Sequence, residues 1–126
     1  MKPLFISLLI IASLFAAGCM NARTITDLSG AIDEQLALSL DAAQNGQWPA
    51  ADAALQRAGA LWDSHETYLR MTVTHEELDA TEEILFEARQ YAGQRDLENY
   101  CSSARQLRMQ MEHLRTLQKI NLQNIF

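Results

Sequence analysis

Hydrophobic residues follow two different patterns along this chain, and the change comes near Cys19. The segment from Leu4 to Ala17 is apolar apart from two serines. Further along, apolar residues recur at helical spacing with polar residues between them, which is the pattern of amphipathic helices. The sequence therefore predicts an N-terminal apolar segment, a short tether over residues 19–26, and a helical domain over residues 27–126.

Glycine, proline and capping residues divide this domain into four predicted helices. Gly46 is suited to the left-handed turn that ends a helix, and Pro49 to the first position of the next one. Thr74 and Glu77 have the spacing of a capping box, and residues 72–74 form either a turn or a kink. The predicted fold is all-α, with antiparallel helical hairpins forming a small three- to four-helix bundle. The predicted helices cover about 27–44, 49–71, 75–92 and 96–123.

The N-terminal segment has the layout of an export signal. Lys2 gives a charged start, the apolar run follows, and small residues precede Cys19. The sequence Ala16-Ala17-Gly18-Cys19 resembles the lipobox of bacterial lipoproteins, in which the cysteine is acylated and becomes the new N-terminus. We therefore predict a lipoprotein-type signal peptide over residues 1–18 and lipidation at Cys19.

Two other fates of this segment stay open. Residues 4–20 are long enough to reach the lower limit for a membrane-spanning helix, so an uncleaved anchor is one alternative. Simple secretion is the other. Either kind of anchor tethers the remainder to the lipid bilayer, on the outer face of the bacterial cytoplasmic membrane.

Charge is distributed unevenly along the exported part. Residues 19–87 contain 3 basic and 13 acidic side chains, whereas residues 88–126 contain 6 basic and 3 acidic ones. In one interpretation the basic last helix neutralises the acidic helices within the fold. In the other, Arg105, Arg108 and Arg115 face anionic lipid or an acidic partner. We do not expect an exported, acidic chain without basic–aromatic clusters to bind nucleic acid.

Candidates for chemistry are few. His75 and Asp79 are one helical turn apart, which is a spacing that holds two metal ligands, although the pattern offers no third ligand. A solvated acidic first turn is the simpler interpretation. Cys101 follows the apolar spacing of its helix and is predicted to be a buried thiol. We therefore predict neither a catalytic residue nor a cofactor.

Three segments carry a resemblance to a known family. They are Trp62-Asp63-Ser64-His65, His75-Glu76-Glu77-Leu78-Asp79 and Asn121-Leu122-Gln123-Asn124-Ile125-Phe126. The chain resembles domain of unknown function 4363, a family of small exported helical proteins found mainly in Firmicutes. The resemblance implies an N-terminal hydrophobic anchor followed by roughly a hundred helical residues, and it implies no activity.

These observations lead to one functional hypothesis and two rivals. We expect a membrane-tethered, extracytoplasmic, non-enzymatic adaptor that binds another membrane or envelope protein, or a second copy of itself. The first rival is a small-ligand carrier with an apolar cavity between its helices. The second is a metal-dependent or hydrolytic enzyme built on His65, His75, Glu76 and Asp79.

Overall fold

The computed structural model describes residues 2–125 and the side chains of residues 2–120. This part of the chain is all-α, as predicted, and contains no strand. The Asn121–Phe126 ending, which carries part of the family resemblance, lies outside the residues whose side chains are described. The helices are α1 (Lys2–Gln44), α2 (Trp48–Ser64), α3 (Glu66–Thr72), α4 (His75–Gly93) and α5 (Leu97–Ile125).

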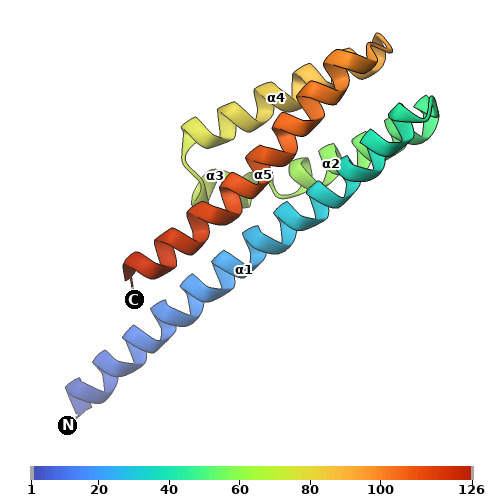
Figure 1. Cartoon of the computed structure of the whole chain (residues 1–126). Helices are drawn as coiled ribbons and strands as arrows, with labels where there is room; N and C mark the ends of the chain where they lie inside the picture. The colour runs from blue at the N-terminus through green and yellow to red at the C-terminus, as the bar shows by residue number, and fades with distance from the viewer. Residues whose placement is uncertain (1, 126) are drawn as a thin grey trace.

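The helices form two antiparallel hairpins, as the sequence predicted. The long helices α1 and α5 lie side by side and run in opposite directions (Figure 1). Helix α2 folds back along α1, and α4 lies along α5, whereas α2 and α4 make few contacts with each other. Both hairpin turns lie at the same end of the bundle, and the N-terminal part of α1 projects beyond the opposite end.

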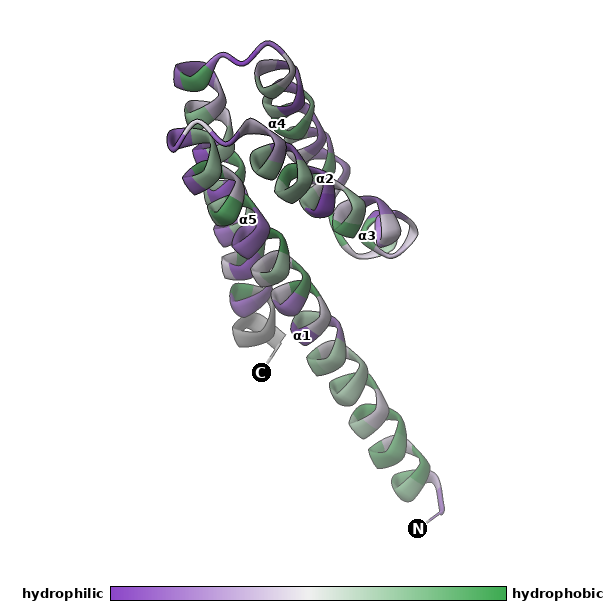
Figure 2. Ribbon diagram, turned by 90° about the vertical axis from the view of Figure 1, so that its right-hand side faces the viewer, coloured by the Kyte–Doolittle hydropathy of each residue, from purple (hydrophilic) through white to green (hydrophobic). Residues whose placement is uncertain are grey.

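The prediction of a tether over residues 19–26 is wrong. These residues continue α1 without a break, with Ala22 and Ile25 buried at 7% and 0% exposure. The reason is that they extend the apolar stripe of Leu28 and Ile32 at helical spacing, and the segment contains neither glycine nor proline. One helix therefore joins the apolar N-terminal segment, green in Figure 2, directly to the bundle.

The prediction of one unbroken helix over residues 49–71 is also wrong, because the chain breaks at His65. In an unbroken helix, the Leu61 carbonyl would accept the backbone N–H of His65. Here it accepts the Ser64 hydroxyl at 2.9 Å and lies 2.9 Å from His65 Nδ1, while the His65 N–H bonds to the Trp62 carbonyl. Side chains that compete for a backbone acceptor end helices in this way.

Residues 72–74, left open between a turn and a kink, form a turn. Helix α3 ends at Thr72, and Val73 is extended, with φ −115° and ψ 145°. The Thr74 hydroxyl accepts the Glu77 N–H at 3.4 Å, which is half of the predicted capping box. The other half is missing because the Glu77 carboxylate bonds to α5 instead.

A buried polar contact joins the two hairpins in the core. Tyr100 of α5 is fully buried, and its hydroxyl forms a hydrogen bond with Ser39 of α1. The Ser39 hydroxyl also lies 2.8 Å from the carbonyl of Ala51 in α2. Burial raises the pKa of Tyr100, so the phenol stays neutral and serves as a structural hydrogen-bonding group. This contact fixes α1, α2 and α5 relative to one another.

A second contact joins the two hairpins at the end of the bundle where both turns lie. Arg95 lies 5.2 Å above the ring of Trp48, and it pairs with Asp52 at 2.8 Å. These residues connect the α4–α5 turn to the start of α2. Gly46, with φ 75°, makes the α1–α2 turn as predicted, while Asp96 begins α5 by accepting the Asn99 N–H at 3.3 Å.

Candidate membrane anchor and docking groove

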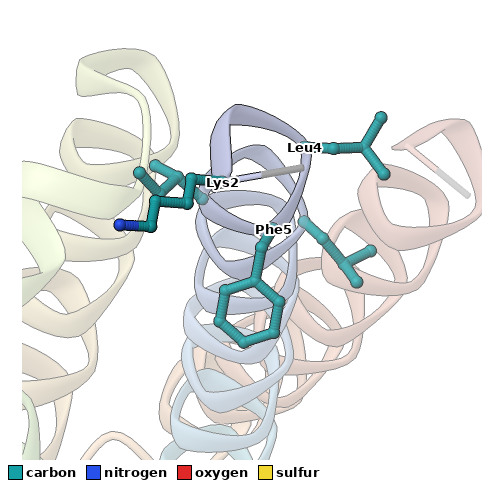
Figure 3. A pocket seen from close by; sticks show the side chains of 5 residues that line it. Lys2, Leu4 and Phe5 are labelled. Carbon is teal, nitrogen blue, oxygen red and sulfur yellow. The ribbon is translucent and has the colours of Figure 1, made fainter.

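The first part of α1 exposes apolar side chains on every side. Lys2, Leu4 and Phe5 project in different directions from its first turns (Figure 3). By length and composition, α1 is the one helix in the described chain that could cross a membrane, although a signal sequence passes the same test. A helix that is apolar all round is suited to a lipid environment rather than to water.

Cys19 lies at the boundary between this exposed segment and the bundle. Its side chain is exposed, whereas Ala22, three residues later, is buried. At about 1.5 Å per residue the packed domain begins roughly 5 Å beyond Cys19. A lipid or a membrane-spanning segment at this point would therefore leave the bundle directly at the membrane surface. Cys101, by contrast, is buried in the core, as predicted.

The three arginines predicted to face a partner lie together on α5. They line a groove on the outer side of α1 and α5, which we call the basic groove. Met109, one of its lining residues, is 71% exposed. The groove is lined by Asp33, Arg105, Arg108, Met109, Glu112 and Arg115.

Two of these arginines are also paired within the fold. Arg108 Nε donates to an Asp33 carboxylate oxygen at 2.8 Å, and this bond raises the pKa of Arg108 further above its ordinary value. Arg115 pairs with Glu112 one turn away. Arg105 is exposed and has no ion pair among residues 2–120. Internal neutralisation thus accounts for Arg108, which pairs with the acidic part of the chain, whereas a partner facing Arg105 stays a prediction.

The position of the groove along the bundle limits what it can contact. Arg108 pairs with Asp33, which is 14 residues beyond Cys19 along the continuous helix α1. The pair therefore lies about 21 Å from Cys19 along the helix axis. This is more than twice the distance of about 8 Å over which salt screens a charge under physiological conditions. If Cys19 marks the membrane surface, the Arg108–Asp33 pair lies beyond the reach of the lipid charges, whereas Arg115, seven residues further along the antiparallel helix α5, lies closer to the membrane.

A polar network between α4 and α5 was not predicted from the sequence. The Glu77 carboxylate accepts the Gln110 amide at 2.9 Å and lies 3.1 Å from His113 Nε2. Gln110 also donates to the Thr81 hydroxyl at 3.1 Å. The hydrogen bond from Gln110 is the main cause that lowers the pKa of Glu77, and His113 adds to it against the effect of burial. The only signal in the sequence was Thr81, a polar residue within an apolar stripe.

This network predicts a loss of stability in acid. A carboxylate with a lowered pKa stabilises the fold above its ordinary pKa of 4.5, and this contribution disappears as the pH falls through the lower value of the folded state. We expect Glu77→Gln to lower the free energy of unfolding by about 1 kcal/mol at pH 7 and by less at pH 3.5. Denaturant unfolding at the two pH values measures this difference.

Glu76→Gln is the matched control, because Glu76 is its exposed neighbour in the same first turn of α4 and has no hydrogen bond through its side chain among residues 2–120. It removes the same charge near the helix N-terminus without touching the network. If both variants lose the same stability at pH 7 and at pH 3.5, the network contributes nothing.

His75 and Asp79, the predicted weak metal candidates, are both exposed on the first turns of α4. Within the part of the chain that the structure describes, no group of three or more histidine, cysteine, aspartate or glutamate side chains is placed to hold a metal ion. His113 of α5 lies 3.1 Å from the Glu77 carboxylate rather than beside His75 and Asp79. The fold therefore brings no third ligand to the pair from residues 2–120.

Comparison with known proteins identifies the family. Residues 20–125 match the sequence profile described as Domain of unknown function (DUF4363). The chain belongs to the DUF4363 family. Searches of curated proteins and of solved structures give no match.

The DUF4363 match begins one residue after Cys19 and covers the packed bundle. The exposed apolar segment of α1 lies before it, and Ala22 and Ile25, the first buried residues, lie within it. The boundary of the family domain thus coincides with the boundary between exposed and packed residues in α1.

Packing in the core of the DUF4363 bundle leaves a small cavity beside Trp62. This cavity has a volume of about 10 Å³, which is room for a single water molecule at most. Trp62, whose indole Nε1 has no hydrogen-bond partner among the described residues, is one of its walls. The other walls are Ile32, Ala58, Thr81, Leu85, Leu107 and Met111. This cavity is too small for an organic ligand, so it does not itself offer a site for the small-ligand carrier that the sequence left as an alternative.

Proposed function

We propose that this DUF4363 protein is a membrane-tethered, extracytoplasmic helical module that binds a protein partner through the basic groove. Its anchor is a lipid on Cys19 after removal of residues 1–18, or the uncleaved segment of residues 4–20. In this proposal the chain acts by binding and performs no catalysis.

The continuity of α1 is the observation that carries the proposal. Residues 2–17 are all exposed and mostly apolar, whereas the same helix is packed in the bundle from Ala22 onward. An exposed apolar surface of this length is costly in water and favourable in lipid. Because the segment contributes no buried residue, its cleavage would leave the core of the bundle complete.

The groove supports a protein as the partner. It combines the unpaired cation of Arg105 with the exposed side chain of Met109, and protein interfaces are enriched in arginine and methionine. Its Arg108–Asp33 pair lies about 21 Å from Cys19 along α1, and Arg105 lies further still, so both are beyond the charged layer of the lipid surface. A partner with acidic and apolar side chains on one face fits this chemistry.

The test compares the natural chain with Cys19→Ser in a bacterial host that processes lipoproteins. Each is separated into membrane and soluble fractions, labelled with a radioactive fatty acid, and weighed by intact-protein mass spectrometry. We expect the natural chain to be labelled, membrane-bound, and shorter by residues 1–18. We expect Cys19→Ser to be unlabelled and to retain those residues, since the acyl acceptor is missing.

The three possible fates of the N-terminal segment give different results in this experiment. A natural chain that is membrane-bound, full-length and unlabelled establishes the uncleaved helix as the anchor. A natural chain that is soluble and unlabelled contradicts the proposal, because no tether would then exist.

A further inference from the structure

The outer face of α4 carries an acidic stripe around one exposed aromatic ring. Asp79, Glu82 and Glu83 are exposed, and no ion pair among residues 2–120 involves them. Phe86, three residues further, is 60% exposed. Side chains at these spacings lie on one side of a helix, and the buried residues of α4 occupy the opposite side. We call these four residues the acidic stripe.

The basic groove has the complementary composition. Where the stripe has unpaired carboxylates beside Phe86, the groove has the unpaired cation of Arg105 beside Met109. Both of these large apolar side chains are mostly exposed, at 60% and 71%. A methionine sulfur packs favourably against an aromatic ring, so contact between them would remove both from water.

The stripe and the groove also lie at the same height along the bundle. Gln110 bonds to the carboxylate of Glu77, which fixes the register between the antiparallel helices α4 and α5. Glu83 is six residues further along α4, and Arg105 is five residues back along α5. Since both helices rise about 1.5 Å per residue, Glu83 and Arg105 are nearly level with each other.

Equal height is what an assembly of tethered copies requires. Copies anchored in one membrane by the same end of α1 share one orientation, so a cyclic assembly has its axis along the membrane normal. Rotation about that axis leaves the height of every residue unchanged. A contact between two different surfaces of the same chain therefore forms only if those surfaces are level.

We propose that a second copy of this chain docks its acidic stripe against the basic groove of the first. The inference rests on the proposed tether, because the tether gives both copies the same orientation. Anchoring in a membrane also raises the effective concentration of one copy around another, which favours a contact between two small surfaces.

Charge reversal tests this contact on the full-length chain. Copies with two different affinity tags are produced in the same cells, solubilised from membranes in mild detergent, and recovered through one tag. The stripe variant is Glu82→Lys with Glu83→Lys, and the groove variant is Arg105→Glu. When both tagged copies carry the stripe variant, or both carry the groove variant, we expect recovery of the second tag to fall at least tenfold. When one tagged copy carries the stripe variant and the other carries the groove variant, we expect recovery of the second tag to be restored.

Asp41→Lys with Glu98→Lys is the matched control. It changes the charge by the same amount at exposed carboxylates outside the stripe and the groove, and should leave recovery unchanged. Circular dichroism of each purified variant shows that it is folded.

Three results overturn the inference. They are no co-recovery of natural copies, undiminished recovery of the stripe variant or the groove variant alone, and a mixed pair that is not restored. Fractionation of the same cells separates this failure from failure of the tether. If the chain is in the membrane fraction but the two tagged copies are not recovered together, only the self-association is overturned. If the chain is absent from the membrane fraction, the self-association and the tether are both overturned.

Discussion

Tyr100→Ala should lower the free energy of unfolding by about 4 kcal/mol, the largest effect we expect from one substitution in the bundle. The side chain is fully buried between the two hairpins, and its ring centroid lies 5.7 Å from that of Trp48. Its removal leaves a cavity and takes away the hydrogen bond to Ser39. Denaturant unfolding of the full chain in mild detergent, followed by circular dichroism, measures the change.

Two controls separate the causes of this loss. Tyr100→Phe removes only the hydroxyl, and Ser39 can still donate to the Ala51 carbonyl, so about 1 kcal/mol is expected. Phe86→Ala removes an aromatic ring that is 60% exposed and should change stability by less than about 0.5 kcal/mol. A loss below about 1 kcal/mol for Tyr100→Ala would show that the hairpins are not joined through this residue.

Leu8→Arg combined with Ile11→Arg should remove the chain from the membrane fraction. Each arginine near the middle of an apolar segment costs about 3 kcal/mol in membrane insertion, so the pair shifts the partition by roughly 10⁴-fold. Both positions are more than half exposed in the bundle structure, and therefore the domain itself should fold as before. Immunoblotting of membrane and soluble fractions measures the shift.

The matched control places a charge on the bundle instead. Leu38→Arg replaces an apolar residue of α1 that is 51% exposed but lies within the packed domain, 19 residues beyond Cys19. This variant should stay in the membrane fraction. A double variant that also stays there would contradict a role of the apolar segment in either export or anchoring.

Helix boundaries were predicted correctly where a local signal sets them. Gly46 turns the chain after α1, Thr74 begins α4 and Asp96 begins α5, because each acts on backbone groups within a few residues of itself. The two wrong boundaries have local causes that were overlooked. The apolar stripe already starts at Ala22, and Ser64 with His65 can bond to the backbone one turn earlier.

The candidate sites were predicted less completely. The sequence singled out Arg105, Arg108 and Arg115 as basic residues of the last helix, and the structure shows that they line one groove. Spacing did not reveal that Asp33 pairs with Arg108, since these residues are 75 positions apart. For the same reason Glu77 was assigned to a local cap, although α5 supplies its hydrogen-bond donors.

The sequence by itself determined the all-α fold, the two hairpins, the apolar N-terminal segment and the burial of residues such as Cys101. Each of these follows from periodicity and punctuation over one or two helical turns. Only the tertiary structure decided which charges are paired, that Glu83 and Arg105 are level, and how small the cavity beside Trp62 is. Those properties depend on the rotation and shift of one packed helix against another, which no single segment of the chain specifies.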